Sequence, residues 1–199
     1  KSSIQQIINS FTIIRKNSKK LHNIATIDDL TDLKRRKCMF DFFNETIKNT
    51  KNIGYLFTDI DNFKSYNSNY GHQQGDVTLQ SVANVILHSI KPTDIAGRYG
   101  GEEFTIILPE TTQKEATILA ERIRNAFKKT YLCPNEGPGV IKTLSIGVSE
   151  YVTGETPDSL FKRADVNLYC AKHSGKDMVV DNRRYINLIE VLNSIASKK

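Results

Sequence analysis

A glycine turn that carries two adjacent carboxylates constrains this 199-residue chain more than any other feature. The turn spans 100–103 and reads Gly-Gly-Glu-Glu. It joins the β-like run 94–99 to the apolar run 104–108, which Pro109 ends. Two such runs around a short turn are typical of a β-hairpin, and glycine allows a positive φ and the close approach of a ligand. We therefore predict a hairpin whose tip presents two glutamates to a divalent cation.

A second pair of acids follows the apolar run 53–58, which is typical of a buried strand. Asp59 and Asp61 stand at the carboxyl end of this run. If the strand lies beside the hairpin, Asp59, the carbonyl of Ile60 and Glu102 converge as hard oxygen ligands. Mg²⁺ prefers such ligands and keeps positions open for water and substrate phosphates. Two ions of this kind would serve a phosphoryl transfer.

Ordered motifs along residues 28–180 resemble the GGDEF-domain diguanylate cyclases, which condense two GTP molecules into cyclic di-GMP. The matching segments are 28–33, 59–64, 67–76, 100–104, 144–149 and 164–172. The glycine turn gives the Gly-Gly-Glu-Glu-Phe variant of the family motif. One match alone is a weak signal, whereas this ordered set is specific.

The resemblance implies a fold and a metal site. The expected fold is α/β, with helices flanking a central mixed, largely antiparallel sheet similar to the class III nucleotide cyclase palm, a ferredoxin-like βαββαβ core with additions. Asp59, the Ile60 carbonyl, Glu102 and Glu103 are the implied metal site, with two Mg²⁺ ions per active half-site and Mn²⁺ as the alternative ion. Glu102 and Glu103 are the implied catalytic residues, and Glu102 is the family's candidate for activating the attacking 3′-hydroxyl.

The same resemblance implies how GTP is held. Asn67 and Asp76 occupy the positions that recognise the guanine edge, because an amide and a carboxylate match its donors and acceptors in a way that adenine cannot. Each domain would hold one GTP. Attack by the 3′-oxygen of one GTP on the α-phosphorus of the other releases pyrophosphate, so catalysis needs a homodimer with two facing domains.

The implied phosphate contacts come from two places in the chain. The backbone amides around Phe63 and Lys64 lie where a strand turns into a helix, where a helix N-terminus favours anions. Lys172 and Lys176 occupy the two phosphate-clamping positions. Arg is usual at the second position, so Lys176 keeps the charge but loses the bidentate geometry.

The product-inhibition motif of the family, Arg-x-x-Asp, is altered in this sequence. Lys91 and Asp94 stand at its two ends, just before the hairpin. Lysine neutralises a phosphate but neither stacks on guanine nor bridges it bidentately as arginine does. We therefore predict a degenerate inhibitory site with weak or absent feedback inhibition.

The chain is expected to divide into a stalk helix over 1–26, a catalytic domain over 27–181 and an additional helix over 182–199. From Ile4 to Ala25 apolar residues recur in steps of three and four, interrupted by Ser18 in the middle, which is a heptad pattern. An intermolecular stalk and a helix packed on its own domain both fit this pattern. The other expected elements are helices over 34–50, 74–90, 112–129 and 157–173, strands over 53–59, 140–150 and 177–181, and the hairpin 94–108.

Composition excludes several other classes of protein. Lys and Arg number 28 against 22 Asp and Glu, a net charge of +6, but no basic run is interleaved with aromatic residues, so we expect no nucleic-acid partner. The three cysteines are scattered, which predicts reduced thiols, no disulfide partner and a cytoplasmic catalytic domain. No apolar run reaches the length of a membrane span. A sensor domain is expected upstream of this sequence, and a membrane anchor upstream of Lys1 stays open.

Two alternatives to an active cyclase remain at the level of sequence. One is a catalytically silent module that binds GTP and regulates a neighbouring domain. The other is a receptor for cyclic di-GMP that uses the inhibitory site. The acids retained in the hairpin argue against the first, and Lys91 in place of arginine argues against the second.

Overall fold

The computed structural model describes residues 26–134, 137 and 139–182. The predicted stalk helix over 1–26 and the predicted helix over 182–199 lie outside these ranges, apart from one residue of each. The described elements are β1 (Lys34–Arg35), α2 (Arg36–Thr46), β2 (Ile53–Ile60), α3 (Phe63–Tyr70), α4 (His72–Ser89), β3 (Ile95–Arg98), β4 (Glu103–Pro109), α5 (Gln113–Lys128), β5 (Leu144–Glu150), α6 (Pro157–His173) and β6 (Val179–Asp181). None of these helices is long and apolar enough to cross a membrane.

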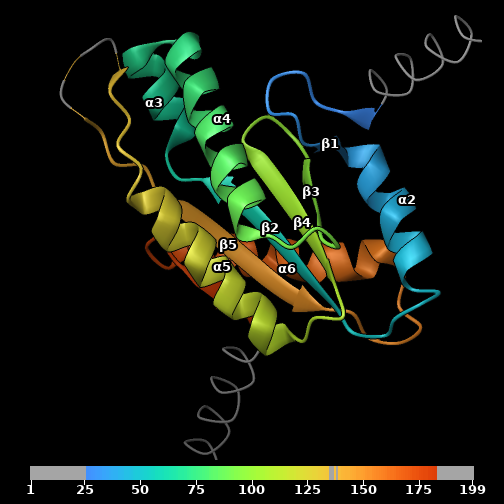
Figure 1. The fold of residues 1–199 in the computed structure, drawn as a ribbon. Coiled ribbons are helices and arrows are strands. Elements are labelled where there is room, and N and C mark those ends of the chain that lie inside the picture. Colours follow the sequence, from blue (N-terminus) through green and yellow to red (C-terminus); the bar gives the residue numbers. More distant parts are fainter. Residues whose placement is uncertain (1–25, 135–136, 138, 183–199) are drawn as a thin grey trace, which may run out of the picture.

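One six-stranded sheet organises the domain, with strand order β1-β3-β4-β2-β5-β6 (Figure 1). The three central pairs, β3–β4, β4–β2 and β2–β5, are antiparallel. The outer pairs, β1–β3 and β5–β6, are parallel. Strands β2 to β5 and the helices between them form the predicted βαββαβ core, so the expected fold class is confirmed.

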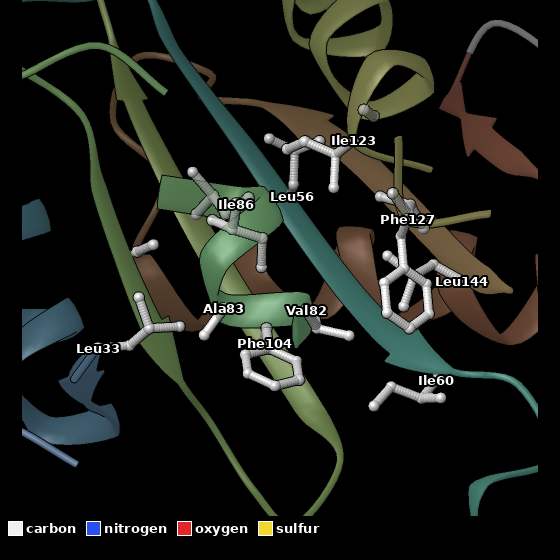
Figure 2. Packing of buried hydrophobic residues seen from close by; sticks show 14 of the residues in the cluster. Leu33, Leu56, Ile60, Val82, Ala83, Ile86, Phe104, Ile123, Phe127 and Leu144 are labelled. Carbon is white, nitrogen blue, oxygen red and sulfur yellow. The ribbon is translucent and has the colours of Figure 1, made fainter. Parts of the chain in front are cut away.

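Helices cover both faces of the sheet, α4 and α5 on one side and α2 and α6 on the other (Figure 1). The first side is mainly aliphatic, and Figure 2 shows Leu56, Val82 and Ile86 among the residues that pack there. The second side is rich in aromatic rings, and Tyr55 stacks on Phe161 with the ring centroids 4.3 Å apart. Because β2 is buried on both faces, its sequence is a continuous apolar run instead of an alternating one.

Helix α6 lies close against β5 because Gly147 has no side chain. A Cβ atom at this position would lie 2.0 Å from the carbonyl oxygen of Ala164. The helix begins at Pro157, after Thr156 accepts a hydrogen bond from the backbone of Ser159, a favourable helix start. This close packing brings Lys172, in the last turn of α6, to the end of β2.

Several element boundaries differ from the sequence predictions, and three of the differences have a visible cause. The helix predicted over 74–90 begins at His72 and is preceded by the separate helix α3, because Gly71 has a φ of +85° and breaks the two apart. The helix predicted over 34–50 is shorter, since its first two residues pair with β3 as β1. The strand predicted over 140–150 begins at Leu144, and Val140 instead forms an isolated bridge with Leu132.

Candidate active site

The predicted hairpin forms, but its glycines act differently from our expectation. Neither Gly100 nor Gly101 has a positive φ, so the turn does not use the backbone freedom that glycine allows. Gly100 instead makes room for a carboxylate, because a Cβ there would lie 2.6 Å from Oε2 of Glu103. At the tip, the Tyr99 amide donates to the Glu103 carbonyl at 2.8 Å, and the Arg98 guanidinium donates to the Gly101 carbonyl at 2.7 Å.

The end of β2 lies beside the hairpin, as the sequence predicted. Asp59 is paired in register with Glu103, and the Ile60 amide donates to the Glu102 carbonyl at 3.4 Å. Burial raises the pKa of Asp59, Glu102 and Glu103, and the charge of Asp59 is the next cause that raises the pKa of both glutamates. The four residues of the predicted metal site are therefore neighbours along the backbone of β2 and the hairpin, and the charge of Asp59 acts on both glutamates.

A lysine already places positive charge on part of this oxygen set. The Lys172 ammonium contacts Oδ1 of Asp59 and lies 3.2 Å from the Ile60 carbonyl oxygen and 3.4 Å from Oδ1 of Asp61. Asp59 and the Ile60 carbonyl therefore fit a cation. Across residues 26–134, 137 and 139–182 no three His, Cys, Asp or Glu side chains gather closely enough to hold a metal ion. A metal here would accordingly depend on the backbone carbonyl as well as on the acids.

Asp61 has a structural environment that the sequence reading missed. Its side chain is buried and accepts hydrogen bonds from the hydroxyls of Thr143 and Ser145, both at 2.7 Å, and from the Asp177 amide at 2.9 Å. These bonds tie the end of β2 to β5 and to the loop after α6. The available signal was the polar pair Thr143 and Ser145 at the start of an otherwise buried strand, since buried hydroxyls require partners.

The two predicted guanine residues lie on neighbouring helices. Asn67 is on α3, and its Oδ1 is buried without a hydrogen-bond partner among the described residues. A Cβ on Gly75 would lie 2.0 Å from that oxygen, so glycine at this position lets the Asn67 amide pack against α4. Asp76 follows directly and is exposed. An unpaired acceptor beside an exposed carboxylate suits a ligand edge that carries adjacent N–H donors.

The predicted phosphate residues surround the turn between β2 and α3. The amides of Phe63 and Lys64 belong to the first turn of α3, whose first internal bond is donated by the Tyr66 amide to the Asn62 carbonyl at 3.1 Å. The Phe63 and Lys64 amides therefore have no hydrogen-bond acceptor within the helix. The Lys176 ammonium contacts Oδ1 of Asn62. Lys172, in the last turn of α6, and Lys176, in the loop after it, therefore both lie beside the segment 59–62.

The predicted inhibitory residues lie elsewhere, in a hollow of about 160 Å³ between α4 and α5. Asp94 Oδ2 accepts from the Lys91 backbone amide at 2.8 Å, which closes a local turn. Arg122 of α5 also lines this hollow, and its guanidinium contacts the Ser89 carbonyl. The sequence reading missed Arg122, because nothing in the spacing relates α5 to the segment before β3.

A larger hollow of about 570 Å³ lies between the hairpin and α6. Tyr99 and Glu103 line one side, and Phe161 and Asp165 line the other. The residues predicted to bind guanine and phosphates do not line it. It meets the candidate active site only at Glu103.

Comparison with known proteins shows the family. The model for the diguanylate cyclase GGDEF domain matches residues 25–178. Diguanylate cyclase A of Treponema denticola is 36% identical over 185 residues, 89% of this chain and 50% of the relative. Response regulator PleD of Caulobacter vibrioides is 36% identical over 173 residues, 84% of this chain and 38% of the relative. The chain belongs to the GGDEF-domain family, and it spans half or less of the length of these curated relatives.

A solved structure agrees with this assignment. The coiled coil and GGDEF domain of DgcB from Caulobacter crescentus, in complex with c-di-GMP, has a TM-score of 0.86 at 29% identity. The match covers 90% of this chain and 97% of that one. The active GGEEF domain of a diguanylate cyclase from Vibrio cholerae has a TM-score of 0.68 at 32% identity, over 75% of this chain and 96% of that one.

Proposed function

We propose that this chain condenses two GTP molecules into cyclic di-GMP and two pyrophosphates, with one GTP bound to each subunit of a homodimer. The observation that carries this proposal is the meeting of two acidic segments with two lysines. Asp59 and the hairpin glutamates lie where the central strands β2 and β4 meet the hairpin tip, and Lys172 contacts Asp59 from α6. A carboxylate set flanked by cations suits a metal-bound triphosphate.

In this proposal the acids and one carbonyl hold the metal ions. Asp59, the Ile60 carbonyl, Glu102 and Glu103 would bind two Mg²⁺ ions, with Mn²⁺ as the alternative. When bound, the ions supply Lewis-acid activation of the phosphate and neutralise its charge. Lys172, released from Asp59, moves to the triphosphate.

The remaining residues position GTP and move a proton. Lys176 and the amides of Phe63 and Lys64 hold the phosphates through charge and hydrogen bonds. Asn67 and Asp76 hold the guanine edge. Glu102 accepts the proton of the attacking 3′-hydroxyl as a general base.

The homodimer follows from the stoichiometry of the reaction. Each domain presents one set of guanine and phosphate residues, whereas the product contains two guanosine units. The 3′-hydroxyl that attacks therefore comes from the GTP of a facing domain. The predicted stalk over 1–26 would hold the two domains together, and a sensor upstream would set their orientation.

A second candidate function is recognition of cyclic di-GMP at the hollow beside Lys91. Arg122 supports it, because this residue supplies there the guanidinium that Lys91 lacks. The DgcB structure was solved in complex with c-di-GMP. Calorimetry with cyclic di-GMP would test this function. Nanomolar binding that is lost in Arg122→Ala would support it and contradict the predicted loss of feedback inhibition, whereas micromolar or weaker binding would argue against it.

The cyclase proposal is tested by incubating the purified chain with GTP and MgCl₂ over a range of protein concentrations. We expect pyrophosphate and a cyclic dinucleotide, with a rate per subunit that rises as dimers form. ATP should give no cyclic product. Tight GTP binding without turnover, at concentrations where the chain is dimeric, would support the silent regulatory module instead.

A further inference from the structure

Lys142, just before β5, has an unusual position for a lysine. Only 9% of the residue is exposed, although lysine is mostly found at the surface. Its ammonium contacts the carbonyl oxygen of Asp61, lies 3.3 Å from that of Asn62 and sits 5.5 Å from the centre of the Tyr66 ring. Burial lowers its pKa, and the charge of Asp61 opposes that effect. A buried ammonium directed at two backbone carbonyls fixes the backbone that carries them.

The residue held in this way is a strained point of the chain. Asn62 has a φ of +55° and precedes α3 without a side-chain capping bond. Lys142 reaches its backbone carbonyl from 80 residues away, and Lys176 reaches its side-chain oxygen from 114 residues away. Two lysines from distant segments therefore hold the same turn from two sides. Asparagine adopts the left-handed region more readily than most residues, and these contacts fix Asn62 in it.

The geometry of the peptide bond connects this contact with the phosphates. In a trans peptide unit the carbonyl oxygen and the following N–H point in opposite directions. The Asn62 carbonyl is directed toward Lys142, so the Phe63 amide of the same peptide unit points away from that lysine. The Asp61 carbonyl and the Asn62 amide are related in the same way. By binding these two carbonyls Lys142 thus orients the Asn62 and Phe63 amides, the second of which belongs to the first turn of α3.

We propose that Lys142 is a positioning residue for the triphosphate, acting through the Asp61–Asn62 turn and not through direct contact with GTP. The inference rests on the proposed function, which assigns the Phe63 and Lys64 amides to the phosphates of GTP. It adds a residue outside the set that the family resemblance supplied. Without Lys142 the Asp61 carbonyl loses its ammonium contact and the Asn62 carbonyl keeps the bond from the Tyr66 amide, so the Asn62 and Phe63 amides are held less firmly.

The test compares Lys142→Met with Lys142→Arg and with Lys48→Met, an exposed lysine paired with Glu45 at the end of α2. Methionine keeps the apolar stem over Tyr66 and removes the charge. The ligand is 3′-deoxy-GTP with MgCl₂, which binds but cannot be cyclised, and guanosine serves as the ligand without phosphates. Calorimetry should show that Lys142→Met weakens 3′-deoxy-GTP binding about tenfold, while guanosine binding stays within about twofold of the parent.

Lys142→Arg should restore most of the affinity for 3′-deoxy-GTP, and Lys48→Met should leave it unchanged. The inference is overturned if Lys142→Met binds 3′-deoxy-GTP like the parent chain, or if it loses guanosine binding to the same degree. If Lys142→Met does not fold, Lys142→Gln takes its place under the same criteria. A parent chain that binds 3′-deoxy-GTP but makes no cyclic dinucleotide from GTP would refute the cyclase proposal and leave this inference standing.

Discussion

The candidate active site and the hollow beside Lys91 both place a lysine next to an aspartate, but they are built differently. At the active site, Asp59 and Lys172 are 113 residues apart and meet only because α6 packs across β2. At the hollow, Asp94 bonds to the backbone of a residue three positions away. The first pair is a product of tertiary structure, and the second is a local turn. Changes at the first should therefore affect chemistry and stability far more than changes at the second.

The largest effect is expected for Glu102→Ala. Removing the proposed base and metal ligand should lower turnover about a thousandfold, measured as pyrophosphate release from GTP. The melting temperature should stay close to that of the parent, since the side chain contributes little to the core. Asp41→Asn on the exposed side of α2 is the matched control. A near-normal rate in Glu102→Ala would refute the metal assignment.

A direct test of the comparison pairs Asp61→Ala with Asp94→Ala. Asp61→Ala removes a buried carboxylate and leaves its three donors without a partner, so it should lower the free energy of unfolding by about 3 kcal/mol. Asp94→Ala breaks a local turn and should cost less than about 1 kcal/mol. Urea denaturation monitored by circular dichroism measures both values. Equal losses would contradict the distinction between the tertiary site and the local turn.

Gly75→Ala should weaken recognition of the guanine base without a large change in the stability of the domain. The new methyl group would occupy the space of Asn67 Oδ1 and displace that side chain. The KM for GTP should rise about tenfold and the preference over ATP should fall. Alanine favours helix more than glycine does, but its methyl group would also lie 3.2 Å from Cζ of Phe63, so the free energy of unfolding should change by less than about 1 kcal/mol. Gln80→Ala on the exposed side of α4 is the control, and an unchanged KM in Gly75→Ala would contradict the role of Asn67.

The smallest expected effect is a gain in stability from Glu103→Gln. Burial raises the pKa of Glu103 above its ordinary value of 4.5, so its charge destabilises the folded domain at any pH above that value. Glu103→Gln should therefore raise the melting temperature by about 2 °C at pH 7.5 without Mg²⁺. At pH 3, where Glu103 is protonated in both states, the difference should vanish. A gain that persists at pH 3 would show that the cause is not the charge.

The strands and acids of the site could be predicted because their signals are local. The run ending at Asp59 and the glycine turn before Glu103 each fit one short element, and the structure confirms that these elements are neighbours. The partners of Asp61 and the carbonyl contacts of Lys142 could not be predicted. They join residues 80 or more positions apart, and no spacing in the sequence encodes such contacts.

By itself the sequence determined which chemistry this chain can carry: carboxylates after an apolar strand, glutamates in a glycine turn, and two lysines near a helix end. Periodicity and turn residues also determined the order of the helices and strands other than β1 and α3, because this order depends on neighbours along the chain. Only the tertiary structure decided that Lys172 binds Asp59, that Asp61 is buried and that Lys142 supports Asn62 from behind. Those contacts depend on how α6 and β5 pack on β2, and packing distances arise only when the sheet is assembled.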